Sequence, residues 1–318
     1  MTPRTASFDR RRSCAAAVLL GGALAALSGA AAADPATVYT ERCAACHGAG
    51  RLGGTGPALI PETLGRMRGP AVAEVIAEGR AATQMPGFAD VLTGAEIAAL
   101  AEYLDTPLAE VPAWSEADIA ASLTPNPDYR APAAARFDAD PMNLFLVVEK
   151  GDHHVSILDG DRFARLARLA TPFAVHGGPK FTPDGRFVFI VSRDGWVQKV
   201  DLWAMQEVAR VRAGINARNI AISRDGRWVA VANYLPHTLT ILSAEDLSVA
   251  RIFEVTGRGG APSRVSAVYQ VPERDSFVLA LKDVPEIWEV ATDPDAPPDH
   301  EGFVHSRETG MVEALPSS

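Results

Sequence analysis

The stretch "FTPDGRFVFIVSRDGWVQKVDLWAMQEVARVRAG", residues 181–214, alternates turn residues with β-branched and aromatic runs. A second stretch, "ISRDGRWVAVANYLPHTLTILSAEDLSVARIFEV" at residues 222–255, superimposes on it with Asp184 over Asp225, a shift of 41 residues. Each copy contains an Asp-Gly turn, a strand, a second turn, a strand that ends near Asp-Leu, and a further strand. The stretch is therefore one copy of a repeated all-β unit.

Weaker copies of the same unit lie on either side of these two stretches. They are "DPMNLFLVVEKGDHHVSILDGDRFARLARLA" at residues 140–170 and "VPERDSFVLALKDVPEIWEVATD" at residues 271–293. A spacing of about 40–45 residues with several strands per unit is typical of the blades of a β-propeller. The sequence predicts four blades within residues 142–293. Residues 294–318 lose this periodicity, and we expect them to form an irregular tail.

The first residues carry the features of a secretion signal. Arg10–Arg12 form a basic start, residues 15–27 are apolar, and residues 31–33 are a run of alanine suited to cleavage. We expect residues 1–33 to be a signal peptide, the mature protein to be exported to the periplasm, and no other segment to span a membrane. Removal of this leader changes the formal net charge from −9 to about −12. A chain this acidic should repel nucleic acid.

The stretch "RCAACHGAG" at residues 42–50 holds the remaining cysteines, because Cys14 leaves with the leader. A zinc site would need two further ligands nearby, and a redox dithiol would need a βαβ setting; neither is visible. In an exported protein, Cys-x-x-Cys followed directly by His is the attachment motif of c-type heme. Both thiols of Cys43 and Cys46 then form covalent bonds to the heme, and His47 becomes an axial iron ligand.

Residues 34–105 resemble the small class I cytochromes c. The stretch "ATQMPGFAD" supplies Met85 in a Pro/Gly loop as the second axial ligand, and Met67, in a segment expected to be a solvated turn, is the alternative. A helix is predicted from Thr93, which forms a capping box with Glu96. The Pro- and Ala-rich residues 106–141 are expected to be an interdomain linker that contains one short helix, "WSEADIAASL".

The combination of both parts is similar to the cytochrome cd1 group. The similarity rests on "FAVHGGPKFTPDGRFVF", "SRDGW", "RAGINARNIAIS" and "VANYLPHTLTIL", and within that group "SRVSAVYQVPERDSFVLALKDVPEIWEV" is most similar to the dihydro-heme d1 dehydrogenases. The similarity to the cytochrome cd1 group covers almost all residues from Asp34 to about Val290. The resemblance implies a multidomain fold: an all-α class I cytochrome c domain followed by a partial all-β propeller, about four blades of an eight-bladed d1-type propeller.

The resemblance also implies a second, non-covalent cofactor, heme d1 or dihydro-heme d1. His176 matches its proximal iron ligand, Lys150 lies near the macrocycle, and Arg193, Arg218 and Tyr234 match residues around its carboxylates, with Asn219 beside them. Arginine suits this role because its guanidinium binds a carboxylate through two hydrogen bonds; the alternative is that the arginines form ion pairs within the blades. The candidate cofactor-binding residues are therefore Cys43, Cys46, His47, Met85, Lys150, His176, Arg193, Arg218, Asn219 and Tyr234, with His47, Met85 and His176 as iron ligands.

The function implied by the resemblance is heme d1 biosynthesis: an oxidoreductase that oxidises dihydro-heme d1 and transfers electrons to heme c. The expected partners are an electron-transfer protein and a cytochrome cd1 nitrite reductase as recipient of heme d1. Two alternatives stay open, a cytochrome cd1 nitrite reductase that reduces nitrite to nitric oxide and a non-catalytic electron-transfer cytochrome with a vestigial propeller. Because the cd1 group builds the rest of the d1 pocket from further blades, we expect a C-terminally truncated propeller, which leaves catalytic activity open.

Overall fold

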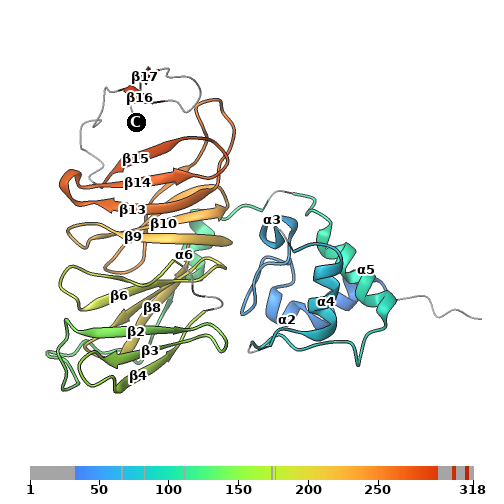
Figure 1. The fold of residues 1–318 in the computed structure, drawn as a ribbon, viewed down its shortest axis with the longest axis horizontal. Coiled ribbons are helices and arrows are strands. Elements are labelled where there is room, and N and C mark those ends of the chain that lie inside the picture. Colours follow the sequence, from blue (N-terminus) through green and yellow to red (C-terminus); the bar gives the residue numbers. More distant parts are fainter. Residues whose placement is uncertain are drawn as a thin grey trace, which may run out of the picture. The chain divides into compact units, whose positions relative to one another are not determined.

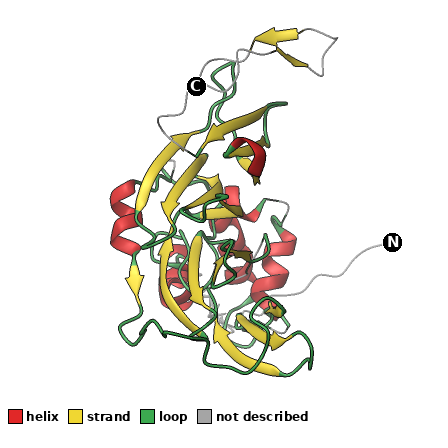
Figure 2. Ribbon diagram, turned by 90° about the vertical axis from the view of Figure 1, so that its left-hand side faces the viewer, coloured by secondary structure: helices red, strands yellow, loops and turns green. Residues whose placement is uncertain are grey.

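The computed structural model describes residues 33–65, 67–81, 83–110, 112–172, 175 and 177–292, together with the backbone of two short strands near the end of the chain. The predicted signal peptide lies outside the described residues, apart from residue 33. Within the part that is described, no helix has the length and apolar character needed to cross a membrane. The described chain is helical up to Asp105, and from Leu144 onward it is formed by strands apart from one short 3-10 helix, η1 (Pro272–Arg274). Figure 2 shows the helices in red and the strands in yellow.

The cytochrome part is all-α. Its helices are α1 (Pro35–Arg42), α2 (Ala44–His47), α3 (Pro61–Leu64), α4 (Pro70–Glu78) and α5 (Gly94–Asp105). The α5 helix begins as predicted: the Thr93 hydroxyl accepts a hydrogen bond from the Glu96 backbone, and the Glu96 carboxylate accepts one from the Thr93 backbone. The apolar face of α5 packs against side chains of α1 and α4, so this part has a hydrophobic core of its own.

The propeller part is built from antiparallel sheets that follow one another along the chain (Figure 1). Within residues 142–292 the described chain forms four of them, as the repeats predict. The first sheet is β2 (Leu144–Glu149), β3 (His154–Asp159) and β4 (Arg165–Ala170), and the second contains β5 (Lys180–Phe181), β6 (Phe187–Val191), β7 (Trp196–Asp201) and β8 (Gln206–Arg212). The third is β9 (Asn216–Ile222), β10 (Trp228–Leu235), β11 (Thr238–Ser243) and β12 (Val249–Glu254), and the fourth is β13 (Val265–Val271), β14 (Ser276–Leu281) and β15 (Ile287–Ala291).

The repeated Asp-Gly turns explain why the two strongest copies superimpose. Asp184 accepts a hydrogen bond from the backbone of Arg186 at 3.1 Å, and Asp225 accepts the equivalent bond from Arg227 at 3.0 Å. The glycine that follows each aspartate has a positive φ, which glycine adopts without steric cost. Each turn therefore reverses the chain between the first and second strands of its blade.

Neighbouring blades pack through their first strands. Strands β9 and β13 lie against each other, and β5 contacts β9. Apolar side chains of the blades form the core, with Val229 and Val231 of β10 in one cluster and Ala230 and Ala232 in the next. This alternation follows from the two-residue period of a strand, which sends successive side chains to opposite faces. Both faces of the third blade are therefore buried.

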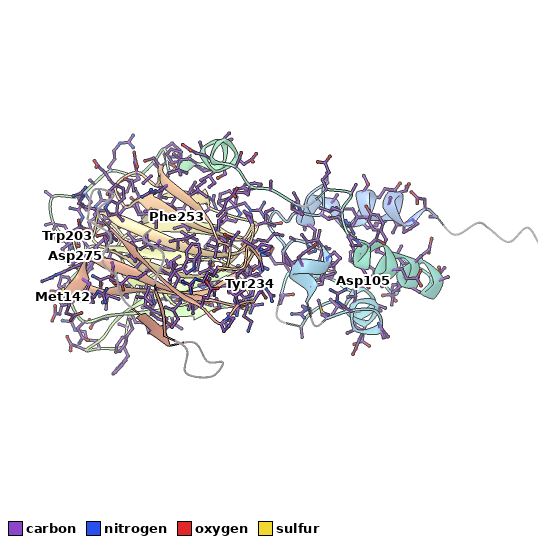
Figure 3. The ribbon with its side chains drawn as sticks, turned by 90° about the horizontal axis from the view of Figure 1, so that it is seen from above. Asp105, Met142, Trp203, Tyr234, Phe253 and Asp275 are labelled. Atoms are coloured by element: carbon purple, nitrogen blue, oxygen red, sulfur yellow. The ribbon has the colours of Figure 1, made fainter. Side chains whose placement is uncertain are left out.

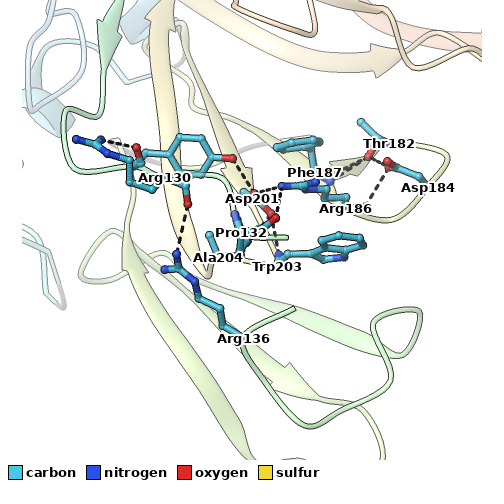
Figure 4. A network of polar contacts seen from close by, with 11 residues as sticks. Arg130, Pro132, Arg136, Thr182, Asp184, Arg186, Phe187, Asp201, Trp203 and Ala204 are labelled. Atoms are coloured by element: carbon cyan, nitrogen blue, oxygen red, sulfur yellow. Dashed lines mark hydrogen bonds and ion pairs between the residues drawn. The ribbon is translucent and has the colours of Figure 1, made fainter. Parts of the chain in front are cut away.

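The segment between the cytochrome part and the first blade is bonded to the second blade. It contains α6 (Glu116–Ser122), the short helix expected from the sequence, and β1 (Thr124–Pro125), which pairs with β8. We call residues 115–136 the strap. Tyr129 of the strap donates a hydrogen bond to Asp201 at 2.7 Å, and Asp201 also accepts one from Arg186 at 3.0 Å (Figure 4). The strap thus adds an outer strand to the second sheet, which its composition did not predict.

Most of the residues after 292 lie outside the description. The backbone of β16 (Phe303–His305) pairs with that of β17 (Val312–Ala314) in an antiparallel register. The rest of residues 294–318 lies outside the described residues, so the irregular tail predicted there stays a prediction.

Candidate functional site

The Cys-x-x-Cys-His motif forms one tight turn at the end of α1. The backbone of Cys46 and the backbone of His47 both donate hydrogen bonds to the Cys43 carbonyl, at 3.1 and 2.9 Å. Both thiols are free of disulfide bonding, with Cys43 buried and Cys46 exposed. Burial and the neighbouring Cys46 raise the pKa of Cys43 to about 11, so this thiol stays protonated at neutral pH. Two thiols and an imidazole on one turn are the donor set that covalent attachment of heme c requires.

The imidazole of His47 is held in the orientation that an axial iron ligand needs. The ring is buried, with 8% of the residue exposed, and its Nδ1 lies 2.8 Å from the Pro57 carbonyl. A carbonyl only accepts hydrogen bonds, so Nδ1 carries the proton and Nε2 keeps the lone pair that binds metal. Burial lowers the pKa of His47, which favours this neutral form, although the bond to Pro57 acts in the opposite direction. The residues present therefore fit heme c.

Met85 lies in a loop whose backbone is held in place. Its N–H donates to the Thr83 hydroxyl at 3.2 Å, and its carbonyl accepts from the Arg80 backbone at 3.0 Å. The side chain is half-buried. Nothing in the described residues tests its role as second axial ligand, so that role stays a prediction.

The alternative ligand Met67 does not lie in a solvated turn, and that interpretation is wrong. Its side chain is half-buried and packs against the core of the cytochrome part, where its sulfur lies 3.5 Å from Arg80. The reason is that methionine adapts to irregular gaps in a core, even between the polar neighbours that made this segment look solvated. No group of three or more His, Cys, Asp or Glu side chains suited to a metal ion occurs among the described residues.

The topology of the blades brings most of the predicted heme d1 residues to one end. In an antiparallel meander, the start of the first strand and the turn between the second and third strands lie at the same end. Arg218 lies near the start of β9, Tyr234 near the end of β10 and Arg193 in the β6–β7 turn. Lys150 lies in the β2–β3 turn, which is equivalent to the β6–β7 turn because β2 and β3 match β6 and β7 in the repeat. We call this the Tyr234 end; Figure 3 shows Tyr234 on the opposite side of the blades from Met142, Trp203 and Asp275.

His176 lies outside the described residues, but both of its neighbours are described. Val175 forms an isolated β-bridge with Ser192, just before Arg193. At Gly177 an added Cβ would lie 2.9 Å from the Arg218 carbonyl and 3.1 Å from the Cα of Asn219. Glycine at 177 is therefore needed for this close approach. Val175 and Gly177 themselves therefore lie beside residues of the Tyr234 end.

Tyr234 lies between two guanidinium groups from neighbouring blades. The Cζ atom of Arg218 is 4.8 Å from the centre of the Tyr234 ring, and that of Arg264 is 5.1 Å from it. Such contacts are favourable because the ring face is electron-rich. The sequence analysis missed Arg264. The sequence could have indicated Arg264 by its position, because it comes immediately before β13 and Arg218 lies near the start of β9, the corresponding strand of the preceding blade.

Arg264 also sets the charge around His237 in the β10–β11 turn. It forms two side-chain hydrogen bonds from Nε to the Asp283 carboxylate, at 2.9 and 3.1 Å, and this guanidinium holds the pKa of Asp283 low. Burial lowers the pKa of the half-buried His237, the charge of Asp283 opposes that effect, and Arg264 adds to it. The Tyr234 end thus carries two arginines, one carboxylate and a histidine, a donor set that suits a ligand with carboxylates.

Of the other residues predicted to bind heme d1, two are exposed and one is buried. Lys150 and Arg193 are exposed, and the backbone carbonyl of Arg193 accepts a hydrogen bond from Ala217 at 3.1 Å. Asn219 is buried, and its side-chain oxygen accepts a hydrogen bond from the Val268 backbone at 3.0 Å. Asn219 therefore joins the third blade to the fourth. The structure brings Arg218 and Tyr234 into contact, and the cofactor roles of all these residues stay predictions.

The loop after the heme c motif and the Tyr234 end share one hydrophobic cluster. Ala58 and Ile60 of the loop pack with Ile215, which precedes β9, and with Leu235 at the end of β10. Pro57, whose carbonyl binds the His47 ring, is adjacent to Ala58 in the chain. His47, the predicted axial ligand of heme c, is therefore connected to the Tyr234 end through a short run of packed residues.

Comparison with known proteins identifies both parts. The family described as "Cytochrome D1 heme domain" matches residues 139–299, and the family described as "Cytochrome C oxidase, cbb3-type, subunit III" matches residues 30–104. The chain is 54% identical over 272 residues to the Dihydro-heme d1 dehydrogenase of Pseudomonas aeruginosa, covering 85% of this chain and 55% of that protein. It is 26% identical over 280 residues to the Nitrite reductase of Stutzerimonas stutzeri, covering 80% of this chain and 47% of that protein.

A solved structure, "Dihydro-heme d1 dehydrogenase NirN in complex with DHE", matches with a TM-score of 0.76 and 54% identity, covering 81% of this chain and 56% of that one. The chain thus spans about half the length of the relatives it matches. These matches confirm the predicted fold class and the predicted cofactors, heme c in the first part and a heme of the d1 type in the second. The cytochrome D1 heme match alone extends over half of the residues, and the chain therefore belongs to the cytochrome D1 heme domain family.

Proposed function

We propose that the chain acts in heme d1 biosynthesis, where it oxidises dihydro-heme d1 with transfer of the electrons to heme c. The observation that carries this proposal is the pair of arginines on Tyr234, at the end of the blades that shares a cluster with the heme c loop. The similarity to the Dihydro-heme d1 dehydrogenase, at 54% identity, supports it over nitrite reduction, because the match to the Nitrite reductase has 26% identity.

The roles of the residues follow from their chemistry. Cys43 and Cys46 would hold heme c covalently, with His47 and Met85 as axial ligands. Heme c supplies a one-electron acceptor whose potential His/Met ligation raises. Arg218 and Arg264 would bind the carboxylates of dihydro-heme d1, and His176 would bind its iron. The Tyr234 ring keeps both guanidinium groups in place, so that the site does not have to order two long side chains when substrate binds.

The reaction removes two electrons and two protons from a side chain of the substrate and leaves a double bond there. Heme c would accept the electrons one at a time and pass each to the external electron-transfer protein, and the protons would go to one protein base and to solvent. His237 is suited to accept a proton, because the lowered pKa keeps its imidazole neutral near pH 7. Electrons would leave heme c for an external electron-transfer protein, and the product would pass to a cytochrome cd1 nitrite reductase. Export to the periplasm is part of the same proposal and rests on the leader sequence.

The experiment is to add dihydro-heme d1 to the heme c-loaded chain and follow its conversion by absorption, with nitrite turnover as a parallel assay. Arg218→Gln is expected to weaken tetrapyrrole binding about tenfold, because one charge-assisted carboxylate contact is lost. Arg227→Gln is the matched control: Arg227 lies 5.3 Å from the ring of Trp228, a similar cation–ring pair in a turn at the other end of the same blade.

Three results would contradict the proposal. Nitrite turnover without conversion would favour the nitrite reductase alternative. Failure to bind any d1-type heme would leave the electron-transfer cytochrome. An equal loss of binding in both arginine variants would show that the Tyr234 end is not where the substrate binds.

A further inference from the structure

Arg212, the last residue of β8, is a buried arginine at the junction between the heme c loop and the second blade. Only 6% of it is exposed. Its backbone N–H donates to the Ser122 hydroxyl at 2.8 Å, its carbonyl accepts from the Trp114 indole at 2.7 Å, and its guanidinium lies 4.8 Å from the Trp114 ring centre. Its side chain therefore has little freedom to move.

The guanidinium of Arg212 connects two turns. Its Nε donates to the backbone carbonyl of Asp194 at 2.8 Å, and its Nη2 donates to the carbonyl of Leu52. The next residue, Gly53, donates from its backbone to the His47 carbonyl at 2.9 Å. A Cβ at Gly53 would lie 3.0 Å from Nη2, so a side chain there would displace the guanidinium. The positive charge of Arg212 thus lies two hydrogen bonds away from the residue that binds heme c iron.

The carboxyl group of Asp194 is buried beside this charge. Only 2% of the residue is exposed, Oδ1 accepts a hydrogen bond from the Ser192 hydroxyl, and no donor among the described residues reaches Oδ2. Burial raises the pKa of Asp194 to about 7, and the Ser192 bond and the Arg212 charge act in the opposite direction. Near neutral pH the carboxyl is therefore present in both protonation states.

The chain contains a second copy of the same tetrapeptide, Ser-Arg-Asp-Gly, at residues 223–226. There the carboxylate of Asp225 is 47% exposed and accepts hydrogen bonds from Ser223 and from the Arg227 backbone. Burial raises the pKa of Asp225, but these bonds together outweigh that effect, so the pKa is lowered. The four residues are the same in both copies, so the difference in burial between Asp194 and Asp225 comes from what packs on each turn. Arg212 and the residues bonded to it cover the β6–β7 turn, which contains Asp194. This copy serves as an internal comparison.

We propose that Asp194 and Arg212 form a charge pair that takes up a proton when heme c is reduced and so makes the heme c potential depend on pH. When one electron reduces the iron, the site loses one positive charge, and a proton from solvent adds to the Asp194 carboxylate. At low pH Asp194 is neutral and the Arg212 charge favours the reduced iron. At high pH the ionised carboxylate offsets Arg212 and favours the oxidised iron. The potential therefore falls as pH rises.

The elements packed around Asp194 leave Arg212 as the charged partner. Ser192 of its own turn is neutral, and Arg212 is the charged group that acts on the Asp194 carboxyl. The groups that contact Arg212 in turn, Leu52 and Gly53 of the heme c loop and Trp114 of the segment before the blades, carry no charge. Arg212 keeps its proton throughout the range of interest, because arginine does so even when burial lowers its pKa, as it does here. The pair needs heme c but not dihydro-heme d1, so its test is independent of the oxidation proposed above.

The test is a spectroelectrochemical titration of the heme c-loaded chain from pH 5.5 to 8.5, with the electrode as electron source. We expect the acid constant of Asp194 to differ about tenfold between the oxidised and reduced forms, which is a fall in potential of about 59 mV across this range. Asp194→Asn should hold the potential near its low-pH value throughout. Arg212→Gln should lower the potential at pH 5.5. Asp225→Asn should leave the pH dependence of the wild type unchanged.

Redox-difference infrared spectra supply a second readout that a purely structural role would not move. A carboxylic acid band that grows on reduction at pH 7, and that is missing in Asp194→Asn, is expected. The proposal is overturned if the wild-type potential is flat over this range, if Asp194→Asn retains the slope, or if the infrared band persists in that variant. Should Asp194→Asn not fold, the band in the wild type and the Arg212→Gln potential decide the matter.

Discussion

Replacement of Gly56 by alanine should displace the ring of His47, the proposed iron ligand of heme c. A Cβ on Gly56 would lie 2.7 Å from Cε1, 2.9 Å from Nδ1 and 3.2 Å from Nε2 of His47, where ordinary contacts are 3.4–4 Å. The ring must therefore retreat by roughly 0.7 Å, and this movement stretches or breaks its 2.8 Å hydrogen bond to Pro57. The structure thus requires glycine at position 56 for the His47 ring to keep its hydrogen bond to Pro57.

The cost can be worked from these contacts. Loss of a buried hydrogen bond costs about 1–3 kcal/mol, and a strained side-chain rotamer adds about 0.5–1.5 kcal/mol. The expected total is about 2–4 kcal/mol before the offset given next, so the midpoint of thermal unfolding of a domain of this size should fall by at least about 4 °C. Alanine itself restricts the unfolded chain and offsets up to about 1 kcal/mol.

The assay compares Gly56→Ala with Gly50→Ala in the same loop. At Gly50 a Cβ meets nothing closer than a Leu52 carbon at 3.9 Å. Both variants therefore restrict the unfolded chain to the same extent, but only Gly56→Ala introduces a clash. Heme-stained gels give the fraction of chain with covalent heme, and thermal unfolding followed by heme absorption gives the midpoint. Equal heme content and equal midpoints in both variants would refute the reasoning that His47 is positioned by this contact.

Three further predictions follow from individual contacts. Met85→His should lower the heme c potential measured by redox titration, because it replaces the proposed thioether ligand. Met67→Ala should leave the potential unchanged and cost about 2–3 kcal/mol of stability through lost core packing. Thr93→Ala should cost about 1 kcal/mol in urea unfolding. The bonds that Glu96 accepts from the Thr93 backbone and hydroxyl lower its pKa, so their stabilising effect is present at neutral pH and is lost in acid as pH falls through the folded-state value. The backbone bond remains in the variant, so the difference between wild type and variant should narrow in acid without vanishing. Asn219→Ala should cost about 1–3 kcal/mol, because it leaves the buried Val268 N–H without its acceptor, and an unchanged urea midpoint would contradict the bridging role.

The elements that the sequence predicted well are those determined by local chemistry. The Asp-Gly turns at Asp184 and Asp225 depend on a carboxylate that binds the backbone two residues later, and the α5 cap depends on residues three apart. The heme c motif is also local, since its donors lie within one turn. Such features are readable because the contacting residues are adjacent in the chain.

The features that the sequence did not reveal depend on residues far apart in it. Arg264 and Arg218 meet on Tyr234 from neighbouring blades, and the pairing is visible only once the register of β9 and β13 is known. The contrast between Asp194 and Asp225 has the same origin, because identical tetrapeptides acquire different burial from what packs over them. Met67 was misjudged from its polar neighbours for the same reason.

The strap has a consequence for the behaviour of the protein in concentrated solution. Strand β8 would otherwise present backbone donors and acceptors along its outer side, which is a template for association with another molecule. Pairing of Thr124 and Pro125 with Arg210 and Ala209 occupies part of that side, and the proline lacks the N–H needed to extend the ladder further outward. The connecting segment therefore protects the second blade against aggregation.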